Sequence, residues 1–406
     1  MFVSNKSAFS SRNFTLFFCG NIFSVLGVWV QRLSLGWHAW QLSESAIIVG
    51  IVAAAQYIPL LILTPFFGVF ADQFKPKKNA IVMHFILMFV AIILSILTFI
   101  DSMDIIYLIF LSLLYGIANS AYSPVRLALI PALVSTNQLS SAVAISSAGF
   151  NLSRFLGPGI AGYIVAVYGL GYAYLVNAIT YIPVIIILAF IKVPDIRKQQ
   201  GIGESFFSRL KEGLVYTLNH DLIKNVIIIA GISSFFGRGL IELLPVFAAT
   251  IFEGDSGTLG ILMASSGFGA VIASIVYMTG YLDMRLSKAV LYGGYGMGLS
   301  CFLFAFTKSL WLGSLMISII GFFITFVAVG SQSEVQMKVT NELRGRVSSL
   351  WTIIVLGGPA IGSLIAGILA SLVDPKTTAL LYSIMCISLL LYINRKHTKD
   401  NSVKKY

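Results

Sequence analysis

The sequence has 406 residues, of which 57% are hydrophobic and only 11% are charged, whereas soluble domains carry about 25% charged residues. This composition excludes an ordinary soluble domain. Runs of about 20 apolar residues recur along nearly the whole chain, so we expect a polytopic helical membrane protein. Three cysteines scattered through apolar segments predict neither a disulfide framework nor a metal site.

Twelve membrane-spanning helices are predicted, and we expect no cleavable signal before the first. Their approximate ranges are 14–40, 46–71, 80–100, 104–126, 139–168, 171–191, 222–249, 257–281, 288–307, 310–335, 344–373 and 377–394. Most of the basic residues that give the net charge of +11 fall in every second connection and in both termini. This asymmetry predicts that both termini are cytoplasmic, in a bacterial inner membrane. Because the positive charge is then topological, we expect no nucleic-acid partner.

The longest basic connection divides six spans from six. We therefore predict an N-terminal six-helix bundle over 1–192, a cytoplasmic linker over 193–221, and a C-terminal six-helix bundle with a basic tail over 222–406. Within the linker, apolar residues at helical spacing predict an amphipathic helix on the membrane surface, serving as a tether. These residues are Phe206, Phe207, Leu210, Leu214 and Leu218.

The two halves repeat each other about 200–210 residues apart. The matching segments are 50–54 with 260–264, 137–139 with 341–343, and 157–160 with 358–361. Many secondary transporters are built from such a duplicated unit, with the substrate path between the halves. A channel or receptor would need a polar pore stripe or a soluble sensor domain, and neither is evident. Without a phosphate-binding loop or a His-Glu-x-x-His motif, we expect no enzyme, cofactor or metal.

A glycine, an acid and a basic cluster follow the second span: Gly68, Asp72, Lys75, Lys77 and Lys78. An acid at a helix end followed by a basic turn suits a latch between neighbouring helix ends, although a purely topological loop would look similar. The pattern resembles the loop signature of the major facilitator superfamily. It departs from that signature at Gln73, Lys75 and Pro76.

The segments 123–162, 341–351 and 29–46 resemble the exporter branch of this superfamily that contains the enterobactin exporter and macrolide efflux proteins. The resemblance covers essentially the whole chain. It implies an all-α polytopic membrane protein with twelve transmembrane helices in two pseudo-symmetric six-helix bundles, the major facilitator fold. The arginine that proton-coupled exporters often carry in the fourth span is replaced here by Ser112.

The predicted fifth span carries small residues every four positions, at Gly149, Ser153, Gly157 and Ala161. They form one ridge of a helix, where small side chains allow close helix contact in lipid. Gly358, Gly362, Ala366 and Ala370 form a matching ridge in the eleventh span. In the resembled family, the motif of Gly157 and Pro158, with Gly162 beyond it, is a hinge and seal. A packing ridge alone is the alternative.

Arg154 lies near the middle of the same span. A charge at mid-bilayer costs about 3 kcal/mol, so we expect Arg154 to face protein or a water-filled cavity. It is either a structural arginine satisfied by helix-end carbonyls or by Asn151, or a group that attracts an anion or takes part in gating.

Five further charges fall within the spans: Arg32, Arg126, Arg238, Glu242 and Glu334. Arg238 and Glu242, four residues apart, share a helix face. The repeat relates Arg32 to Glu242, and Arg126 nearly to Glu334. We hypothesise an Arg32–Glu242 pair that forms in one conformation and breaks in another, with Arg126 and Glu334 as an inner lock. Fixed structural pairs are the alternative.

Glu242 and Glu334 are candidate proton carriers, because a dry environment raises the pKa of a carboxyl group. His38 and His84 lie near predicted span ends, where we expect interfacial positions. Four arginines against two acids favour an anionic substrate. Aromatic residues such as Trp29 and Tyr57 are expected to be interface anchors or packing residues, or to stack a ring-bearing compound.

Together these features predict a monomeric secondary transporter, driven by protons, that exports a small organic molecule, with a siderophore favoured. Multidrug or antibiotic efflux and solute uptake are the alternatives that the sequence leaves open.

Overall fold

The computed structural model describes residues 7–403 apart from 72–75, 192, 194–205 and 280–285. These residues form helices and no strand. Ten stretches of the described chain are long and apolar enough to cross a membrane. Two further helices, α5 and α12, contain more glycine and serine and complete the predicted set of twelve.

The first half of the chain follows the predicted spans closely. Its helices are η1 (Ala8–Ser10), α1 (Arg12–Ser43), α2 (Ala46–Ala71), α3 (Pro76–Phe99), α4 (Ile105–Ala132), η2 (Thr136–Gln138), α5 (Leu139–Tyr168) and α6 (Leu170–Phe190). Asp104 caps α4 by accepting a hydrogen bond from the backbone N–H of Tyr107 at 2.8 Å. Gly169, with φ of 92°, takes a backbone conformation between α5 and α6 that favours glycine.

The second half contains one departure from the prediction. Its helices are α7 (Phe206–Asn219), α8 (Asp221–Ser233), η3 (Ser234–Arg238), α9 (Gly239–Ile241), α10 (Leu244–Thr250), α11 (Ser256–Thr279), α12 (Leu286–Ala305), α13 (Leu310–Lys338), α14 (Asn341–Leu372) and α15 (Pro375–Val403). The span expected over 222–249 is confirmed as one stretch, Asp221–Thr250, that is long and apolar enough to cross a membrane. Its helix is not continuous, because a π-helical turn, η3, lies between α8 and α9 and a break follows before α10. Pro245 lies at the start of α10, where its missing N–H is tolerated.

The chain separates into two compact units. Unit 1 comprises 1–44, 55–202 and 254–264, and unit 2 comprises 45–54, 203–253 and 265–406. Helices α2 and α11 therefore each contribute residues to both units. The division into 1–192, 193–221 and 222–406 stays a prediction.

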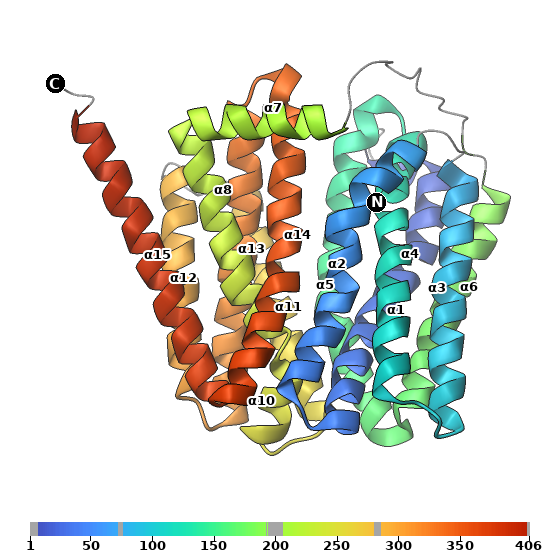
Figure 1. The fold of residues 1–406 in the computed structure, drawn as a ribbon. Coiled ribbons are helices and arrows are strands. Elements are labelled where there is room, and N and C mark those ends of the chain that lie inside the picture. Colours follow the sequence, from blue (N-terminus) through green and yellow to red (C-terminus); the bar gives the residue numbers. More distant parts are fainter. Residues whose placement is uncertain (1–6, 72–75, 192, 194–205, 280–285, 404–406) are drawn as a thin grey trace. The chain divides into compact units, whose positions relative to one another are not determined.

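In unit 1, α6 packs against both α1 and α3, while α1 also contacts α5 and α3 contacts α4 (Figure 1). The interface between α1 and α6 contains polar groups as well as apolar ones. The side-chain amide of Asn177 donates a hydrogen bond to that of Gln31, and both residues are fully buried. Near one end of α1, His38 Nδ1 lies 3.1 Å from the hydroxyl oxygen of Tyr174.

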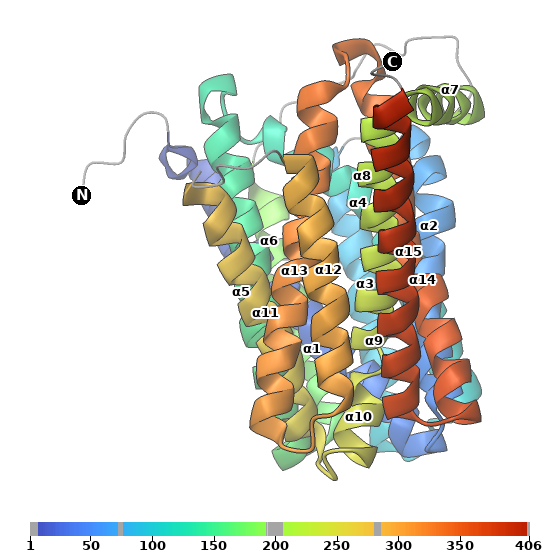
Figure 2. The same cartoon turned by 90° about the vertical axis from the view of Figure 1, so that its left-hand side faces the viewer.

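In unit 2, α12 packs against α13, α15 and α8, which run alongside one another in Figure 2. Helix α14 packs against η3 and α8. With α8, α12, α13, α14 and α15 in the places of α1, α3, α4, α5 and α6, the contacts of α12 with α13 and α15, and of α8 with α14 and α15, correspond to contacts in unit 1, as expected for a duplicated six-helix unit.

The amphipathic helix predicted in the linker is α7, which runs across the ends of α8 and α14 within unit 2 (Figure 1). Gly213 faces α14, where an added Cβ would lie 2.9 Å from the backbone carbonyl of Arg346. Glu212 forms an ion pair with Arg346. Leu214 and Leu218 of the predicted apolar face remain 42% and 55% exposed, as expected for a helix whose apolar face meets lipid.

Replacing Asn177 by Leu is expected to destabilise unit 1 by about 1–3 kcal/mol, because the fully buried amide of Gln31 then lacks its partner. Thermal unfolding of the purified protein in detergent measures this as a lower Tm. The double variant Gln31→Leu/Asn177→Leu removes both polar groups and should lie closer to the wild type. A Tm of Asn177→Leu equal to that of the wild type would contradict the expected role of this pair.

Candidate functional site

Two of the three charged residues predicted within the spans of unit 1, Arg32 and Arg154, lie close to one tryptophan. The guanidinium carbon of Arg32 lies 5.2 Å from the ring centroid of Trp29 and 4.7 Å from that of Tyr57. From α5, the guanidinium carbon of Arg154 lies 5.9 Å from the same Trp29 ring. Phe150 packs edge-on against that ring at 5.9 Å. One indole on α1 is therefore in contact with cations from two helices.

The small-residue ridge of α5 makes this arrangement possible. Gly149, Ser153, Gly157 and Ala161 are all buried. A Cβ added to Gly157 would lie 2.6 Å from the Cβ of Trp29 and 3.3 Å from the carbonyl oxygen of Leu26. Only glycine therefore lets α5 approach α1 closely enough for Arg154 to reach the indole.

Electrostatics give this cluster a preference for anions. The two centroid distances add up to about 11 Å, so the guanidinium carbons of Arg32 and Arg154 are no further apart than that. Two like charges at this separation repel by at least about 1.5 kcal/mol at an effective dielectric constant of about 20, before any counter-charge is considered. An anion between them would relieve this repulsion.

Other polar groups of unit 1 lie deeper than the sequence predicted. His38 and His84, expected at the interface, are only 5% and 1% exposed. The reason is that α1 continues to Ser43 and α3 begins at Pro76, so both histidines lie within helices that pack against neighbours. His84 contacts the rings of Tyr122 and Tyr181 edge-on at 4.5 and 5.8 Å, and its Nδ1 lies 2.7 Å from the carbonyl oxygen of Ala80.

The charges predicted to form an inner lock belong to different units. Arg126 lies on α4 in unit 1, one helical turn after Tyr122, and is half-buried. Glu334 lies on α13 in unit 2 and is 4% exposed. One turn before it, the Ser331 hydroxyl accepts a hydrogen bond from Trp351 Nε1 at 2.9 Å. The pairing of Arg126 with Glu334 stays a prediction.

The other predicted pair of unit 2 lies at the break in the seventh span. Arg238 is the last residue of η3, and Glu242 immediately follows α9. The backbone N–H of Glu242 still donates to the carbonyl of Arg238 at 3.1 Å, so the helical spacing between them is kept. Both are half-buried. Since Arg32 belongs to unit 1, its pairing with Glu242 stays a prediction.

The π-helical turn is explained by its neighbour. A Cβ added to Gly358 of α14 would lie 2.8 Å from the Cβ of Ser234, and Gly362 lies against the backbone of Phe235 and Gly239. The hydroxyl of Ser234 donates to the carbonyl of Val355 at 2.6 Å. π-Helical turns occur frequently at functional sites, and this one places Arg238 at its end.

Glycines also bring helices together beyond the Gly157 contact. In unit 1, a Cβ on Gly162 of α5 would lie 2.7 Å from the carbonyl oxygen of Ser256 and 3.0 Å from the Cα of Gly260, both on α11. In unit 2, a Cβ on Gly50 of α2 would lie 2.5 Å from the carbonyl oxygen of Ser363 on α14. The two crossings are related by the repeat, and both depend on the absence of side chains.

The predicted loop motif is described only in part. Gly68 lies near the end of α2, and Asp72 and Lys75 lie outside the described residues. Lys77, in the first turn of α3, donates hydrogen bonds of 2.9 Å to the carbonyls of Ala189 and Ile191. These carbonyls end α6, so Lys77 caps that helix and opposes its negative dipole end. Lys78 is exposed.

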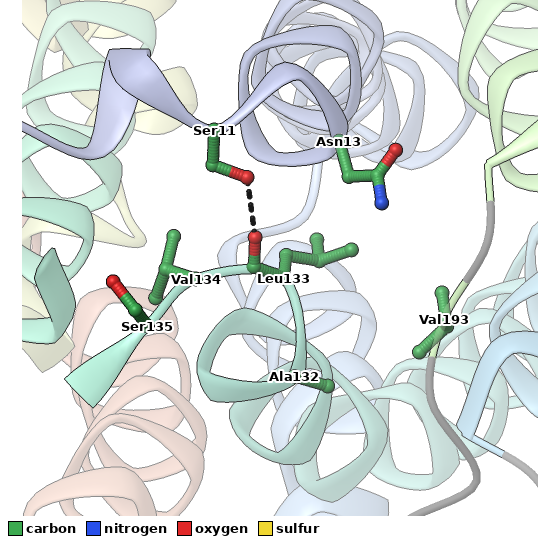
Figure 3. Close-up of a pocket in the computed structure, with 7 residues that line it drawn as sticks. All are labelled: Ser11, Asn13, Ala132, Leu133, Val134, Ser135 and Val193. Carbon is green, nitrogen blue, oxygen red and sulfur yellow. Dashed lines mark hydrogen bonds between the residues drawn. The ribbon is translucent and has the colours of Figure 1, made fainter.

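A hollow of about 450 Å³ lies where α1 begins, between α4, the segment that follows it, and Val193 (Figure 3). The hydroxyl of Ser11 donates to the carbonyl of Leu133 at 2.6 Å across it. The hollow is lined by Ser11, Asn13, Ala132, Leu133, Val134, Ser135 and Val193, none of them charged. None of the predicted site residues lines this hollow.

The two repeated sets of membrane helices, with charges placed inside them, define a membrane transporter of the major facilitator fold. Among solved structures, the chain is similar to a bacterial homologue of the human lysosomal transporter Spinster in an inward-facing, unoccupied conformation. The TM-score is 0.75 at 12% identity, covering 98% of this chain and 99% of the other.

A family model described as transmembrane secretion effector, one of the major facilitator families, matches residues 3–403, and the chain belongs to this family. It is 28% identical over 391 residues to the staphyloferrin A transporter of Staphylococcus aureus, covering 94% of this chain and 96% of the relative. It is 24% identical to an enterobactin exporter of Escherichia coli, covering 86% and 82%. The family consists of transporters rather than enzymes, as the sequence predicts.

Replacing Gly162 by Ala is expected to lower Tm, because the new methyl group would overlap backbone atoms of α11 and overpacking costs about 1–3 kcal/mol. Gly159→Ala is the matched control on the same helix, since its added Cβ would meet nothing within 4 Å. Thermal unfolding in detergent compares the two. Equal Tm values for both variants would show that the α5–α11 crossing tolerates a side chain.

Replacing Lys77 by Met is expected to cost about 1 kcal/mol, because two carbonyls at the end of α6 lose their donor. Lys77→Arg keeps a cation within reach and should retain most of the stability. Lys211→Met, at an exposed position on α7, is the control for loss of a charge. The three Tm values are compared at low and high salt, since screening should reduce the dipole contribution. A Lys77→Met protein as stable as Lys211→Met would argue against the capping role.

Proposed function

We propose that this transporter exports a small organic molecule of the siderophore class, driven by protons and working by alternating access. The similarity over nearly the whole chain to the staphyloferrin A transporter carries the proposal, and similarity to the enterobactin exporter supports it. The arginine cluster around Trp29 agrees with it, because a cationic site suits a chelator that binds ferric iron through anionic oxygen groups.

Proton coupling is assigned to the acids within the spans. Glu334 is almost fully buried and Glu242 lies at the break before α10. Acids within membrane-spanning segments often belong to proton relays in transporters. Ser112, at the position where an arginine is usual, is fully buried on α4 and leaves these acids as the candidates.

From the basic residues in every second connection, we infer that both termini lie in the cytoplasm of a bacterial cell. In this orientation, the close helix contacts at Gly162, between α5 and α11, and at Gly50, between α2 and α14, lie towards the outer face of the membrane. We assign Gly157, Pro158 and Gly162 to the moving contacts of transport, with the lysines after α2 as a latch on the inner side. In this assignment, Lys77 contributes to the latch by donating hydrogen bonds to the carbonyls at the end of α6.

The proposed function predicts that a deletion strain grown without iron loses one siderophore from the medium and accumulates it inside the cell. Mass spectrometry of medium and cell contents measures both, and wild-type protein should restore secretion. In inverted membrane vesicles, uptake of that compound should need a proton gradient and should fall at least tenfold in Glu334→Gln.

Each alternative has its own result in this experiment. An unchanged siderophore profile together with greater drug sensitivity would instead establish multidrug efflux. Loss of uptake from the medium, with secretion intact, would reverse the direction of transport.

A further inference from the structure

We infer that the segment preceding the first membrane helix of each half forms a clasp on the fifth helix of that half. In unit 1 the clasp is η1 on α5, and in unit 2 it is α7 on α14. Each clasp fixes the part of its helix that precedes the proline, so bending takes place at Pro158 and Pro359. The inference rests on the proposed function only in taking α5, and α14 as its repeat, to be helices that move.

Hydrogen bonds tie η1 to two neighbouring helices of unit 1. The backbone N–H of Ala8, which is fully buried, donates to the hydroxyl of Ser141 on α5 at 3.1 Å. Three residues later, the hydroxyl of Ser11 donates to the carbonyl of Leu133, which follows α4, at 2.6 Å. A three-residue helical turn is too short to be stable alone. These contacts therefore fix the position of η1 between α4 and α5.

Aromatic packing continues this tie along α5. The ring of Phe9 in η1 lies edge-on to that of Phe18 on α1, with 5.8 Å between the centroids. Phe18 lies against Gly149 of α5, where an added Cβ would be 2.8 Å from its ring. Ala142, earlier on α5, is buried in the same apolar cluster as Ala8. The clasp of unit 1 thus holds α5 over about two turns, all of them before its proline.

In unit 2, α7 crosses the N-terminal end of α14 and makes the equivalent contact there (Figure 1). Gly213 leaves no room for a side chain between α7 and the backbone of Arg346. Glu212 forms an ion pair with the Arg346 side chain. Thr217 is buried on the same side of α7 as Gly213, and its hydroxyl donates to the Gly213 carbonyl at 2.8 Å. Close packing and opposite charges therefore hold α7 on α14.

The internal repeat relates the two contact points. The matching segments 137–139 and 341–343 are 204 residues apart, so Ala142 corresponds to Arg346. Ala142 is buried together with η1 on α5, and Arg346 is where α7 packs on α14. Segments of different length and sequence thus hold the same position in both halves, which indicates a shared mechanical role.

The clasped part of each fifth helix ends at a proline. Pro359 has no N–H to donate to the carbonyl of Val355, one turn earlier, and that carbonyl accepts the hydroxyl of Ser234 at 2.6 Å. Pro158 interrupts α5 at the place that the repeat relates to Pro359. A missing backbone hydrogen bond makes a helix easier to bend, so the bend falls at the prolines and not in the clasped segments.

The clasp of unit 2 is tested first, by amide hydrogen exchange of the purified full-length protein in lipid nanodiscs. Gly213→Ala would push α7 away from α14, so exchange over 341–355 should become at least fivefold faster. Gly345→Ala is the matched control, because its added Cβ would meet nothing within 4 Å, and should not accelerate exchange. Equal exchange over 341–355 in the two variants, or equal acceleration on both sides of Pro359, would overturn this clasp.

The ion pair and the clasp of unit 1 are tested in the same way. Glu212→Arg and Arg346→Glu should each accelerate exchange over 341–355, and the double variant, with the charges exchanged, should recover at least half of the lost protection. Ala142→Leu should accelerate exchange over 139–153 at least fivefold, whereas Ala144→Leu, at an exposed position of α5, should not. No recovery in the double variant would overturn the role of the ion pair, and equal exchange in the two alanine variants would overturn the clasp of unit 1.

The position of the bend is tested with pairs of spin labels, in protein whose three native cysteines are replaced by serine. Labels at Lys211→Cys on α7 and Ser349→Cys on α14 lie on the same clasped body, so their distance distribution should be narrow. Labels at Ser349→Cys and Ser371→Cys lie on opposite sides of Pro359, and their distribution should be broader or have two maxima. All three positions are exposed. A first distribution as broad as the second would overturn the assignment of bending to the proline.

The outcomes separate the clasps from the proposed function. Hydrogen exchange and label distances need no cargo, so they can establish the clasps even where deletion of the transporter leaves siderophore secretion unchanged, which overturns siderophore export alone. A secretion defect in the deletion strain, with equal exchange in Gly213→Ala and Gly345→Ala, would keep export and overturn the clasp of unit 2.

Discussion

The contact between Gly157 and Trp29 is the interaction on which the charged part of unit 1 depends. Backbone and side chain approach so closely there that a single methyl group on residue 157 would lie 2.6 Å from the Cβ of Trp29. Because α5 can lie that close to α1, Arg154 reaches an indole that already carries Arg32. In lipid, where apolar burial does not drive helices together, close packing of this kind is the main source of association. The same contact thus holds the helices and assembles the cluster.

Polar groups within the membrane segments are handled in two different ways. Some are satisfied by other side chains, as in the Gln31–Asn177 pair between α1 and α6. Others are placed where their exposed sides open away from the packed core, as with Arg32 and Arg154. The first kind stabilises the bundle, and the second holds charges within the membrane segments at a cost in stability. A transporter needs both, since a rigid frame must carry groups that exchange partners.

Much of the fold was predictable because its main signal is local. Apolar runs predicted nearly all the helices, and the span over 139–168 coincides with α5. The π-helical turn η3 was missed, because the glycines that lie against it, Gly358 and Gly362 of α14, are more than 100 residues away in the sequence. The burial of His84 was missed for a similar reason, since the length of α3 alone does not show that Tyr122 and Tyr181 cover it. Trp29 was expected to anchor, to pack or to stack a ring-bearing compound, and its contact with Arg154 depends on the close approach of α5 to α1 at Gly157.

The internal repeat has a further consequence when the cluster is traced from one copy to the other. With the offsets of the matching segments, Trp29, Arg32 and Arg154 correspond to Gly239, Glu242 and Val355. The duplicated copies have therefore kept a common arrangement of helices while their chemistry diverged, to the point that a base in one copy is an acid in the other. Selection after duplication has acted on the backbone and the side chains separately.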